Sequence, residues 1–317
     1  MRPKMLTERA PSAPAEVPGR DAPPRSVLVG LIGAGIQASK SPAMHEREAE
    51  AQGLRCIYRL IDLVPLGLGA EAAGELLTSA QRMGFAGVNV THPCKQAIVD
   101  ELDALSPEAE AIGAVNTVVF EGPRRVGYNT DAYGFGESLR RFLPDARLDR
   151  VVQIGAGGAG AAVAHAALSR GVGALTLVDL DAGRAQALAA RLRQRFGDRI
   201  AVAARTPALA DADGLINATP IGMARYPGMP VTESLLHPKL WVADIVYTPL
   251  ETELLRAARR LGCRTLPGGG MAVFQAVEAF RLFTGIVPDA ARMLRHFDSM
   301  NAGADLSSTN HNSSMGG

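Results

Sequence analysis

Cysteine, unbalanced charge and long hydrophobic runs are scarce in this 317-residue sequence. The three cysteines, Cys56, Cys94 and Cys263, are scattered and lack CxxC spacing, which argues against a disulfide framework and indicates a reducing, cytoplasmic environment. Lys and Arg number 33 against 32 Asp and Glu, so we expect no surface that recruits nucleic acid or an anionic membrane. The composition is that of a globular protein.

Metal ligands and targeting segments are also scarce. The six histidines include no HxxxH pair, and we expect no bound metal. Residues 1–25 lack the apolar core of a signal peptide and predict a disordered leader, and residues 301–317 predict a flexible polar tail. The remaining length favours two domains. A homodimer is compatible with this composition, which does not determine an oligomeric state.

The region from Val151 to Asp179 has the pattern of one nucleotide-binding βαβ unit. A buried strand leads into Gly155, Gly157 and Gly160, spaced as GxGxxG, and an alanine-rich helix and a second strand follow. These glycines permit a tight turn, a close approach to a pyrophosphate and close packing of the helix on its strand. The helix N-terminus then offers N–H groups and a positive dipole end to the phosphates. The sequence therefore predicts a dinucleotide site.

Asp179 indicates which dinucleotide binds. An acidic residue about 20 positions after the glycine loop accepts hydrogen bonds from the adenine-ribose hydroxyls and repels a 2′-phosphate, so NAD is favoured over NADP. Arg184 leaves alternatives open, because it could reach a phosphate, lie over the adenine or pair with Asp181.

A second glycine pattern, Gly33 to Ala38, matches GxGxxA and is followed by its own acid, Asp62. Pro42 argues against a second dinucleotide site, because it would fall inside the helix that must start within the glycine loop. We expect that helix to begin at Pro42, with Ser41 either as a plain N-cap or as a ligand-binding hydroxyl beside Ser39.

The first half of the chain alternates strands and helices, which predicts a mostly parallel α/β sheet. Its third strand, Gly87 to Val90, leads into Thr91 and Lys95 and then into a helix expected to continue to Leu105. In the first turn of a helix the positive dipole end disfavours the ammonium form of lysine, which would suit proton transfer. An ordinary surface lysine is the alternative.

Further polar residues stand at predicted strand ends. Asn116 lies in an apolar strand, and Asp131 opens a helix either as its N-cap or, if Thr130 caps it, as a free carboxylate. The turn from Asn217 to Met223 can place backbone groups near the cofactor, and Tyr247 projects from the next strand end. The run Gly268 to Gly270 before the last predicted helix is a hinge or a close-approach site.

With these residues assembled, the chain resembles the shikimate dehydrogenase family, and within it the bacterial NAD-dependent quinate/shikimate dehydrogenases. The resemblance spans roughly residues 27 to 294 and rests on eight ordered motifs: SKSPAMH (39–45), GVNVTHPCK (87–95), GAVNTV (113–118), YNTDAYGF (128–135), GAGGAG (155–160), NATPIGM (217–223), DIVYTP (244–249) and GMAVFQAVEAFRLFTG (270–285).

The resemblance implies an α/β fold with an N-terminal substrate domain (26–130), a Rossmann domain (131–269) and C-terminal helices (270–300) that complete the first domain. It places the active site where the two domains face each other, with Lys95 and Asp131 as the catalytic pair. The implied substrate contacts, with Tyr247 added as a strand-end residue, are Ser39, Ser41, Thr91, Asn116, Tyr247 and Gln275. The implied cofactor contacts beyond the fingerprint glycines are Gly158, Ala159, Asp179, Arg184, Asn217, Thr219, Pro220, Ile221, Gly222, Met223, Ile245 and Gly268.

Two details bear on the reaction that the resemblance implies, the NAD-dependent oxidation of shikimate and quinate. The chain carries Asp179-Leu180-Asp181 where NADP-dependent relatives carry an Asn-Arg-Thr type pattern, which supports NAD. Ser41 stands where quinate-using members often carry threonine, which favours shikimate over quinate. The alternatives are a biosynthetic enzyme that reduces 3-dehydroshikimate, a dehydrogenase of the aminoshikimate branch, and an inactive NAD-binding sensor, which would lack Lys95 or Asp131.

Overall fold

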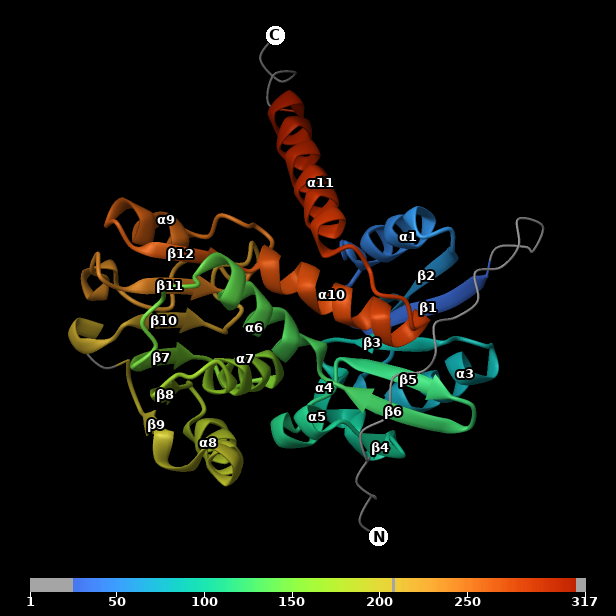
Figure 1. The fold of residues 1–317 in the computed structure, drawn as a ribbon, viewed down its shortest axis with the longest axis horizontal. Coiled ribbons are helices and arrows are strands. Elements are labelled where there is room, and N and C mark those ends of the chain that lie inside the picture. The colour runs from blue at the N-terminus through green and yellow to red at the C-terminus, as the bar shows by residue number, and fades with distance from the viewer. Residues whose placement is uncertain (1–24, 207–208, 312–317) are drawn as a thin grey trace. The chain divides into compact units, whose positions relative to one another are not determined.

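The computed structural model describes residues 25–206 and 209–311, with side chains to residue 301. Apart from Arg25, the predicted leader lies outside these residues. The described chain forms two compact units, unit 1 with residues 25–109, 115–128 and 280–288, and unit 2 with residues 110–114, 129–279 and 289–311 (Figure 1). Helix α10 (Gly269–Thr284) contributes to both units, so the domain boundaries expected from the sequence stay a prediction.

Unit 1 is built on a six-stranded sheet of order β2-β1-β3-β5-β6-β4. The first three strands in this order are parallel, β5 is antiparallel to both of its neighbours, and β4 is parallel to β6. Its strands are β1 (Ser26–Gly33), β2 (Arg55–Asp62), β3 (Gly87–Val90), β4 (Ala104–Leu105), β5 (Thr117–Glu121) and β6 (Arg124–Tyr128). The accompanying helices are α1 (Ser41–Ala51), α2 (Leu63–Leu66), α3 (Ala73–Arg82), α4 (Cys94–Ala97) and α5 (Pro107–Ile112), the last of which continues into unit 2.

The core of unit 1 lies between β1, β3 and β5 and the helix α3. Ile32, Val88 and Val118 from the strands pack in one cluster with Leu77 and Ala80 of α3, and all five are fully buried. Helix α3 has a strongly amphipathic sequence, so its apolar stripe covers the sheet while its other face meets water. This packing fixes the carboxyl ends of β1 and β3, from which the predicted substrate residues follow.

Unit 2 is a fully parallel sheet of order β12-β11-β10-β7-β8-β9. Counted from its first strand, this is the 3-2-1-4-5-6 order of the dinucleotide-binding Rossmann fold. Its strands are β7 (Arg150–Ile154), β8 (Ala174–Val178), β9 (Ile200–Ala203), β10 (Gly214–Asn217), β11 (Trp241–Asp244) and β12 (Arg264–Pro267). Its helices are α6 (Thr130–Phe142), α7 (Gly158–Ser169), α8 (Ala182–Phe196), α9 (Glu253–Arg260), most of α10, and α11 (Ala290–His311). The predicted α/β class is confirmed.

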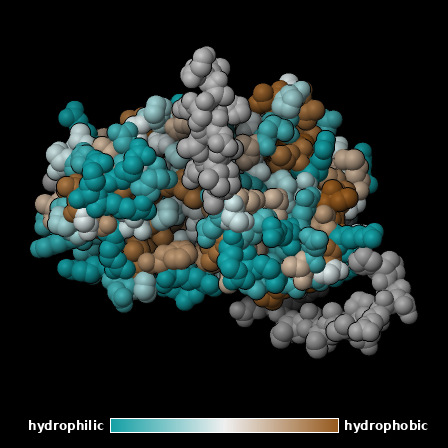
Figure 2. Space-filling view, turned by 90° about the horizontal axis from the view of Figure 1, so that it is seen from above, coloured by the Kyte–Doolittle hydropathy of each residue, from teal (hydrophilic) through white to brown (hydrophobic). Residues whose placement is uncertain are grey.

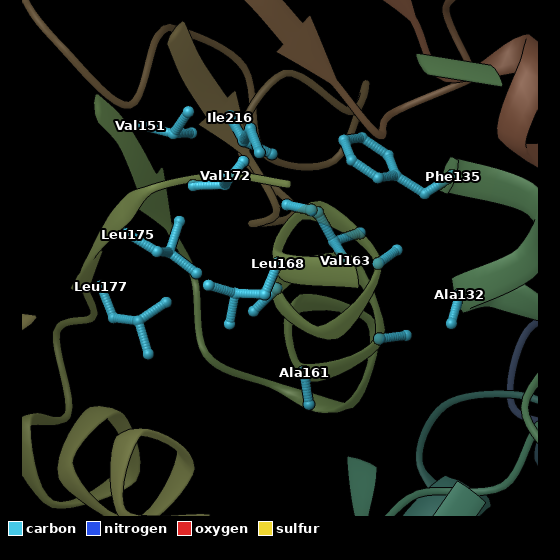
Figure 3. Close-up of a cluster of buried hydrophobic side chains, with 14 of the residues drawn as sticks. Ala132, Phe135, Val151, Ala161, Val163, Leu168, Val172, Leu175, Leu177 and Ile216 are labelled. Atoms are coloured by element: carbon cyan, nitrogen blue, oxygen red, sulfur yellow. The ribbon is translucent and has the colours of Figure 1, made fainter. Parts of the chain in front are cut away.

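Successive residues of the unit 2 strands serve two different cores. Val151 packs toward α6, α7 and α8, whereas its neighbour Val152 packs toward α9. This follows from the alternation of side chains along a strand, and it explains why the strands read as continuous apolar runs. Figure 3 shows part of the first core, where Val151 and Leu175 gather with Leu168 of α7.

One prediction about a helix was wrong. The helix expected from Pro93 to Leu105 ends at Ala97, and a 3-10 turn (Val99–Glu101) and the short strand β4 follow it. Pairing of Ala104 with Val126 of β6 explains this, because a tertiary contact overrides the local helical pattern. At the other end, α11 includes residues 301–311, and the flexible tail expected from residue 301 stays a prediction. Residues 312–317 lie outside the described part.

The face of the protein drawn in Figure 2 interleaves hydrophilic residues with small hydrophobic areas. This mixture matches the balanced composition of the sequence. Within residues 25–206 and 209–311, every helix is too short or too polar to cross a bilayer.

A buried carboxylate, Asp244, joins the carboxyl ends of two strands in unit 2. Its Oδ1 accepts hydrogen bonds from the Nδ2 of Asn217 at 3.0 Å and from the N–H of Val246 at 3.0 Å, and its Oδ2 accepts from the hydroxyl of Thr252 at 2.8 Å. Burial raises the pKa of Asp244 to about 6, although these three hydrogen bonds act in the opposite direction. The carboxyl group of Asp244 therefore binds its proton more tightly in the folded unit than in the unfolded chain.

This raised pKa predicts a pH dependence of stability. The contribution of Asp244 to the free energy of unfolding is fully present below its ordinary pKa of 3.8 and is lost as the pH rises through about 6. The loss amounts to at most about 3 kcal/mol. In Asp244→Asn, whose amide does not titrate, this fall is expected to disappear from urea unfolding curves between pH 4 and 7. The exposed Asp149→Asn serves as control, and parallel profiles for wild type and Asp244→Asn would contradict the prediction.

Candidate active site

The glycine loop of unit 2 has the geometry that its sequence predicts. Gly155 has a φ of +102°, and a Cβ there would lie 2.5 Å from the carbonyl oxygen of Ala218. A Cβ at Gly160 would lie 2.3 Å from the carbonyl oxygen of Gly155, so the start of α7 packs directly on the loop. Gly157 is the N-cap of α7. The first N–H groups of a helix have no acceptor inside it, so those of Gly158 and Ala159 can bind phosphate oxygens.

The sequence pattern missed a residue that holds this loop. Gln153, in the buried strand before it, donates from Nε2 to the carbonyl oxygens of Gly155 and Gly160, both at 2.8 Å. Its side chain is completely buried. A polar residue inside an otherwise apolar strand was the available signal, because a buried amide must find partners. Gln153 thus clamps the two ends of the loop together.

Asp179 follows β8 and contacts the same loop. Its Oδ2 accepts the N–H of Ala156 at 2.7 Å, and its Oδ1 accepts the N–H of Asp181 at 2.9 Å. Of the alternatives for Arg184, the structure shows ion pairing, with Nη2 3.7 Å from Asp181 Oδ2 and Nη1 3.8 Å from Asp179 Oδ1. Each oxygen of Asp179 accepts one backbone N–H, and a carboxylate oxygen can accept two hydrogen bonds.

The turn after β10 is held from within unit 2. Asn217 donates from Nδ2 to the carbonyl oxygen of Ile221 at 2.9 Å and to Asp244, while its Oδ1 accepts from the hydroxyl of Thr219 at 2.7 Å. The side chains of Pro220 and Met223 are exposed on this turn. The remaining predicted cofactor contacts of this region follow neighbouring strand ends, and a Cβ at Gly268 would lie 2.4 Å from the carbonyl oxygen of Ile245. Of the two alternatives for the glycine run 268–270, a hinge or a close-approach site, the structure supports the close approach of two backbone segments.

Asp131 and Gln275 come from two helices of unit 2 that pack closely. A Cβ at Gly134 of α6 would lie 2.6 Å from the carbonyl oxygen of Met271 and 2.8 Å from the backbone nitrogen of Gln275 in α10. Glycine at this position is what lets the backbones of α6 and α10 approach. Asp131 is not the helix N-cap: Asn129 is, because its extended backbone lets Oδ1 accept the N–H of Ala132 at 3.2 Å.

Tyr247 is electrostatically coupled to Asp131. Partial burial raises the pKa of the Tyr247 hydroxyl, and the negative charge of Asp131 raises it further. This electrostatic effect links one predicted catalytic residue with one predicted substrate contact, both in unit 2.

Unit 1 carries Ser39 and Ser41 at the start of α1. The prediction that Ser41 caps this helix was wrong, because Lys40 already has helical backbone angles (φ −87°, ψ −4°) and is the N-cap. Ser41 is the first helical residue, and its N–H donates to the hydroxyl oxygen of Ser39 at 3.3 Å. Both serines are half-buried.

The other predicted residues of unit 1 follow β3 or precede β5. Lys95 is the second residue of the four-residue helix α4, and its carbonyl oxygen accepts the N–H of Val115 at 2.8 Å. A helix of one turn has little dipole, so the expectation that a long helix acts on Lys95 was wrong. Thr91 packs against Gly33, where a Cβ would lie 2.3 Å from its Cγ2. The structure thus joins the segment of Thr91 and Lys95 to the first glycine loop.

Asn116 belongs to a buried polar network. Its Oδ1 accepts the hydroxyl of Thr117 at 3.1 Å, and Thr117 in turn accepts from Asn89 Nδ2 at 2.9 Å. The hydroxyl of Tyr58 donates to Asn89 Oδ1 at 2.7 Å. Because each buried group finds a partner, the network fixes the orientation of the Asn116 amide. Tyr58 and Asn89 were not singled out from the sequence.

The predicted residues therefore divide between the units. Unit 1 holds Ser39, Ser41, Thr91, Lys95 and Asn116, and unit 2 holds Asp131, Tyr247, Gln275 and all of the predicted cofactor contacts. Among the described residues, no group of three or more His, Cys, Asp or Glu side chains is placed to hold a metal ion.

Known proteins match the chain over most of its length. Residues 31–118 match the shikimate dehydrogenase substrate binding domain, and residues 268–296 match the shikimate 5′-dehydrogenase C-terminal domain. A shikimate dehydrogenase (NADP(+)) of Streptomyces avermitilis is 63% identical over 273 residues, which cover 85% of this chain and 94% of that protein. A quinate/shikimate dehydrogenase (NAD(+)) of Corynebacterium glutamicum is 49% identical over 284 residues, which cover 87% of this chain and 99% of that protein.

A solved structure agrees with these sequences. The quinate dehydrogenase from Corynebacterium glutamicum in complex with NAD is similar with a TM-score of 0.80 and 48% sequence identity, over 87% of this chain and 99% of that one. Identity at this level over nearly the whole of each relative confirms the resemblance seen in the eight motifs: the chain belongs to the shikimate dehydrogenase family.

Proposed function

We propose that this oxidoreductase transfers hydride from a ring secondary alcohol of shikimate, and less readily of quinate, to NAD. The products are 3-dehydroshikimate and 3-dehydroquinate. The relatives named for shikimate and quinate support the substrate class. Ser41, which lacks the methyl group of threonine, supports the order of preference between the two. The three free cysteines support a cytoplasmic enzyme.

Lys95 and Asp131 carry the chemistry in this proposal. The nicotinamide, when bound, accepts the hydride. Lys95 takes the proton of the substrate hydroxyl while the C–H bond breaks, so that the C–O bond becomes a carbonyl. Asp131 orients Lys95 and accepts a hydrogen bond from the neighbouring ring hydroxyl. The remaining ring hydroxyls and the carboxylate are held by Ser39, Ser41, Thr91, Asn116, Tyr247 and Gln275.

The observation that carries the choice of NAD is the anchored carboxylate of Asp179. Its hydrogen bonds to the N–H groups of Ala156 and Asp181 hold it beside the glycine loop. Each oxygen can accept one more hydrogen bond, as a ribose with two free hydroxyls requires. A 2′-phosphate at the same place would face a fixed negative charge.

A second candidate function is a shikimate dehydrogenase that uses NADP and works in the reductive direction. The relative that is 63% identical is named for NADP(+). Arg184 supplies a physical route, because its guanidinium lies 3.8 Å from Asp179 and is half exposed, within reach of a phosphate after a change of rotamer. Comparing the two cofactors separates the candidates.

Removal of Lys95 tests the catalytic assignment. Lys95→Ala is expected to lower kcat with shikimate by roughly two orders of magnitude, because the base that accepts the hydroxyl proton is lost. Steady-state kinetics at saturating NAD measure this, with circular dichroism to show that the fold is kept. Lys239→Ala, at an exposed position, is the matched control. An unchanged kcat in Lys95→Ala would refute the assignment.

The cofactor preference rests on Asp179. With shikimate, the wild type is expected to have a kcat/KM at least about tenfold higher for NAD than for NADP. In Asp179→Ala the ratio should shift toward NADP by about tenfold or more, because the repelling charge is gone and Arg184 loses one of its two carboxylate partners. Initial rates with both cofactors measure the ratio. If the ratio of kcat/KM for NAD to kcat/KM for NADP is the same in Asp179→Ala as in the wild type, the carboxylate of Asp179 does not select the cofactor.

A further inference from the structure

The first glycine loop, Gly33 to Ala38, is closed by a carboxylate of its own chain. Asp62, at the end of β2, accepts the N–H of Gly35 at 2.8 Å through Oδ1, and through Oδ2 the N–H of Ile36 at 3.1 Å and the Nε2 of Gln37 at 2.9 Å. Its Oδ1 also accepts the N–H of Val64 at 3.1 Å. Asp62 is 4% exposed.

These four hydrogen bonds use the full capacity of the carboxylate. Two oxygens offer about four acceptor positions, and each oxygen of Asp62 accepts two donors. Asp179, by contrast, accepts one backbone N–H through each oxygen. The carboxylate of Asp62 therefore has its acceptor positions filled by its own chain, whereas each oxygen of Asp179 accepts a single backbone N–H.

The loop leads directly to the two serines at the start of α1. The carbonyl oxygen of Ile36, whose N–H is bound by Asp62, accepts the N–H of Ser39 at 2.9 Å. The hydroxyl of Ser39 in turn accepts the N–H of Ser41. Hydrogen bonds thus connect Asp62, through the backbone of Ile36 and Ser39, to the hydroxyl of Ser39 and to the backbone N–H of Ser41.

The same loop is tied on its other side to the segment that carries Lys95. The N–H of Ala34 donates to the carbonyl oxygen of His92 at 2.9 Å. Gly35 has a φ of +67°, which allows the sharp turn that points successive N–H groups at Asp62. Burial alone would raise the pKa of Asp62, but the hydrogen bonds from Gln37, Gly35, Val64 and Ile36 outweigh it and lower that pKa. The carboxylate is therefore charged at neutral pH.

We propose that Asp62 is a positioning residue that sets the substrate affinity of this enzyme by holding, through the loop 33–38, the backbone segment that carries Ser39 and Ser41. The inference rests on the proposed function, since it assumes that the two serines bind the substrate ring. Asp62 itself touches neither substrate nor cofactor. Its loss should weaken the binding of shikimate and leave the cofactor site in unit 2 intact.

Asp62→Asn tests this proposal. The amide keeps the shape of the carboxylate, but its NH2 group replaces one acceptor oxygen and then faces N–H donors. We expect the KM for shikimate to rise roughly tenfold or more, from the loss of charged hydrogen bonds. We expect kcat to change by less than about threefold and the KM for NAD by less than about twofold. A purely structural defect would lower the active fraction, and hence kcat, without this selective change in KM.

Two further variants keep the test decisive if Asp62→Asn folds poorly. Gly35→Ala has space for its methyl group but strains the backbone at positive φ, and should raise the KM for shikimate about fivefold or more. Asp103→Asn is the matched control, because its carboxylate accepts the N–H of Arg125 at 2.7 Å elsewhere in unit 1. Its KM for shikimate should equal that of the wild type.

The outcomes are distinct. A folded Asp62→Asn and Gly35→Ala with unchanged KM for shikimate, or with an equal rise in the KM for NAD, would overturn the role of Asp62 and leave the proposed function standing. A wild type that oxidises neither shikimate nor quinate would overturn the proposed function and this inference with it. A selective rise in the KM for shikimate, absent in Asp103→Asn, would establish the role.

Discussion

In each unit of this protein, a carboxylate at the end of a parallel strand accepts backbone hydrogen bonds from a glycine loop and so holds the loop against the strand. Asp62 does this in unit 1, and Asp179 does it in unit 2. Parallel strands place their carboxyl ends at one edge, where loops can reach the acid of the next strand. The two sites differ in how many donors the acid accepts. This difference is a physical reason for the different roles that we propose for two similar glycine patterns in one sequence.

Close backbone approaches at glycines complete the arrangement in unit 2. Gly155 and Gly160 bring the loop and α7 against β7, and Gly134 brings α6 against α10. The second approach aligns the helix that carries Asp131 with the helix that carries Gln275. The side chains that we propose as ligand contacts in these helices are thus placed by glycines, and a methyl group at Gly134 would push the two helices apart.

The sequence predicted the α/β class, the Rossmann unit and the strand from Gly87 to Val90, because buried parallel strands and glycine fingerprints are local patterns. It failed where a distant contact decided the outcome. The helix expected to continue to Leu105 yields to pairing of Ala104 with β6. The caps of α1 and α6 lie at Lys40 and Asn129 for a local reason, the backbone angles at the start of each helix. The role of Gln153 depends on the positions of the carbonyl groups of Gly155 and Gly160 in the folded loop, and the spacing of residues in the sequence does not give these positions.

The most direct test of this account asks whether the second glycine loop alone binds the cofactor. Gly157→Asp should fold, because the position has open space and an ordinary φ of −70°, and aspartate is a favoured N-cap. It would place a carboxylate where the pyrophosphate must bind, and so make this loop resemble that of Asp62. Calorimetric titration with NAD should show one site per chain in the wild type and an affinity lowered by about tenfold or more in Gly157→Asp. Undiminished binding in a folded Gly157→Asp would contradict the account.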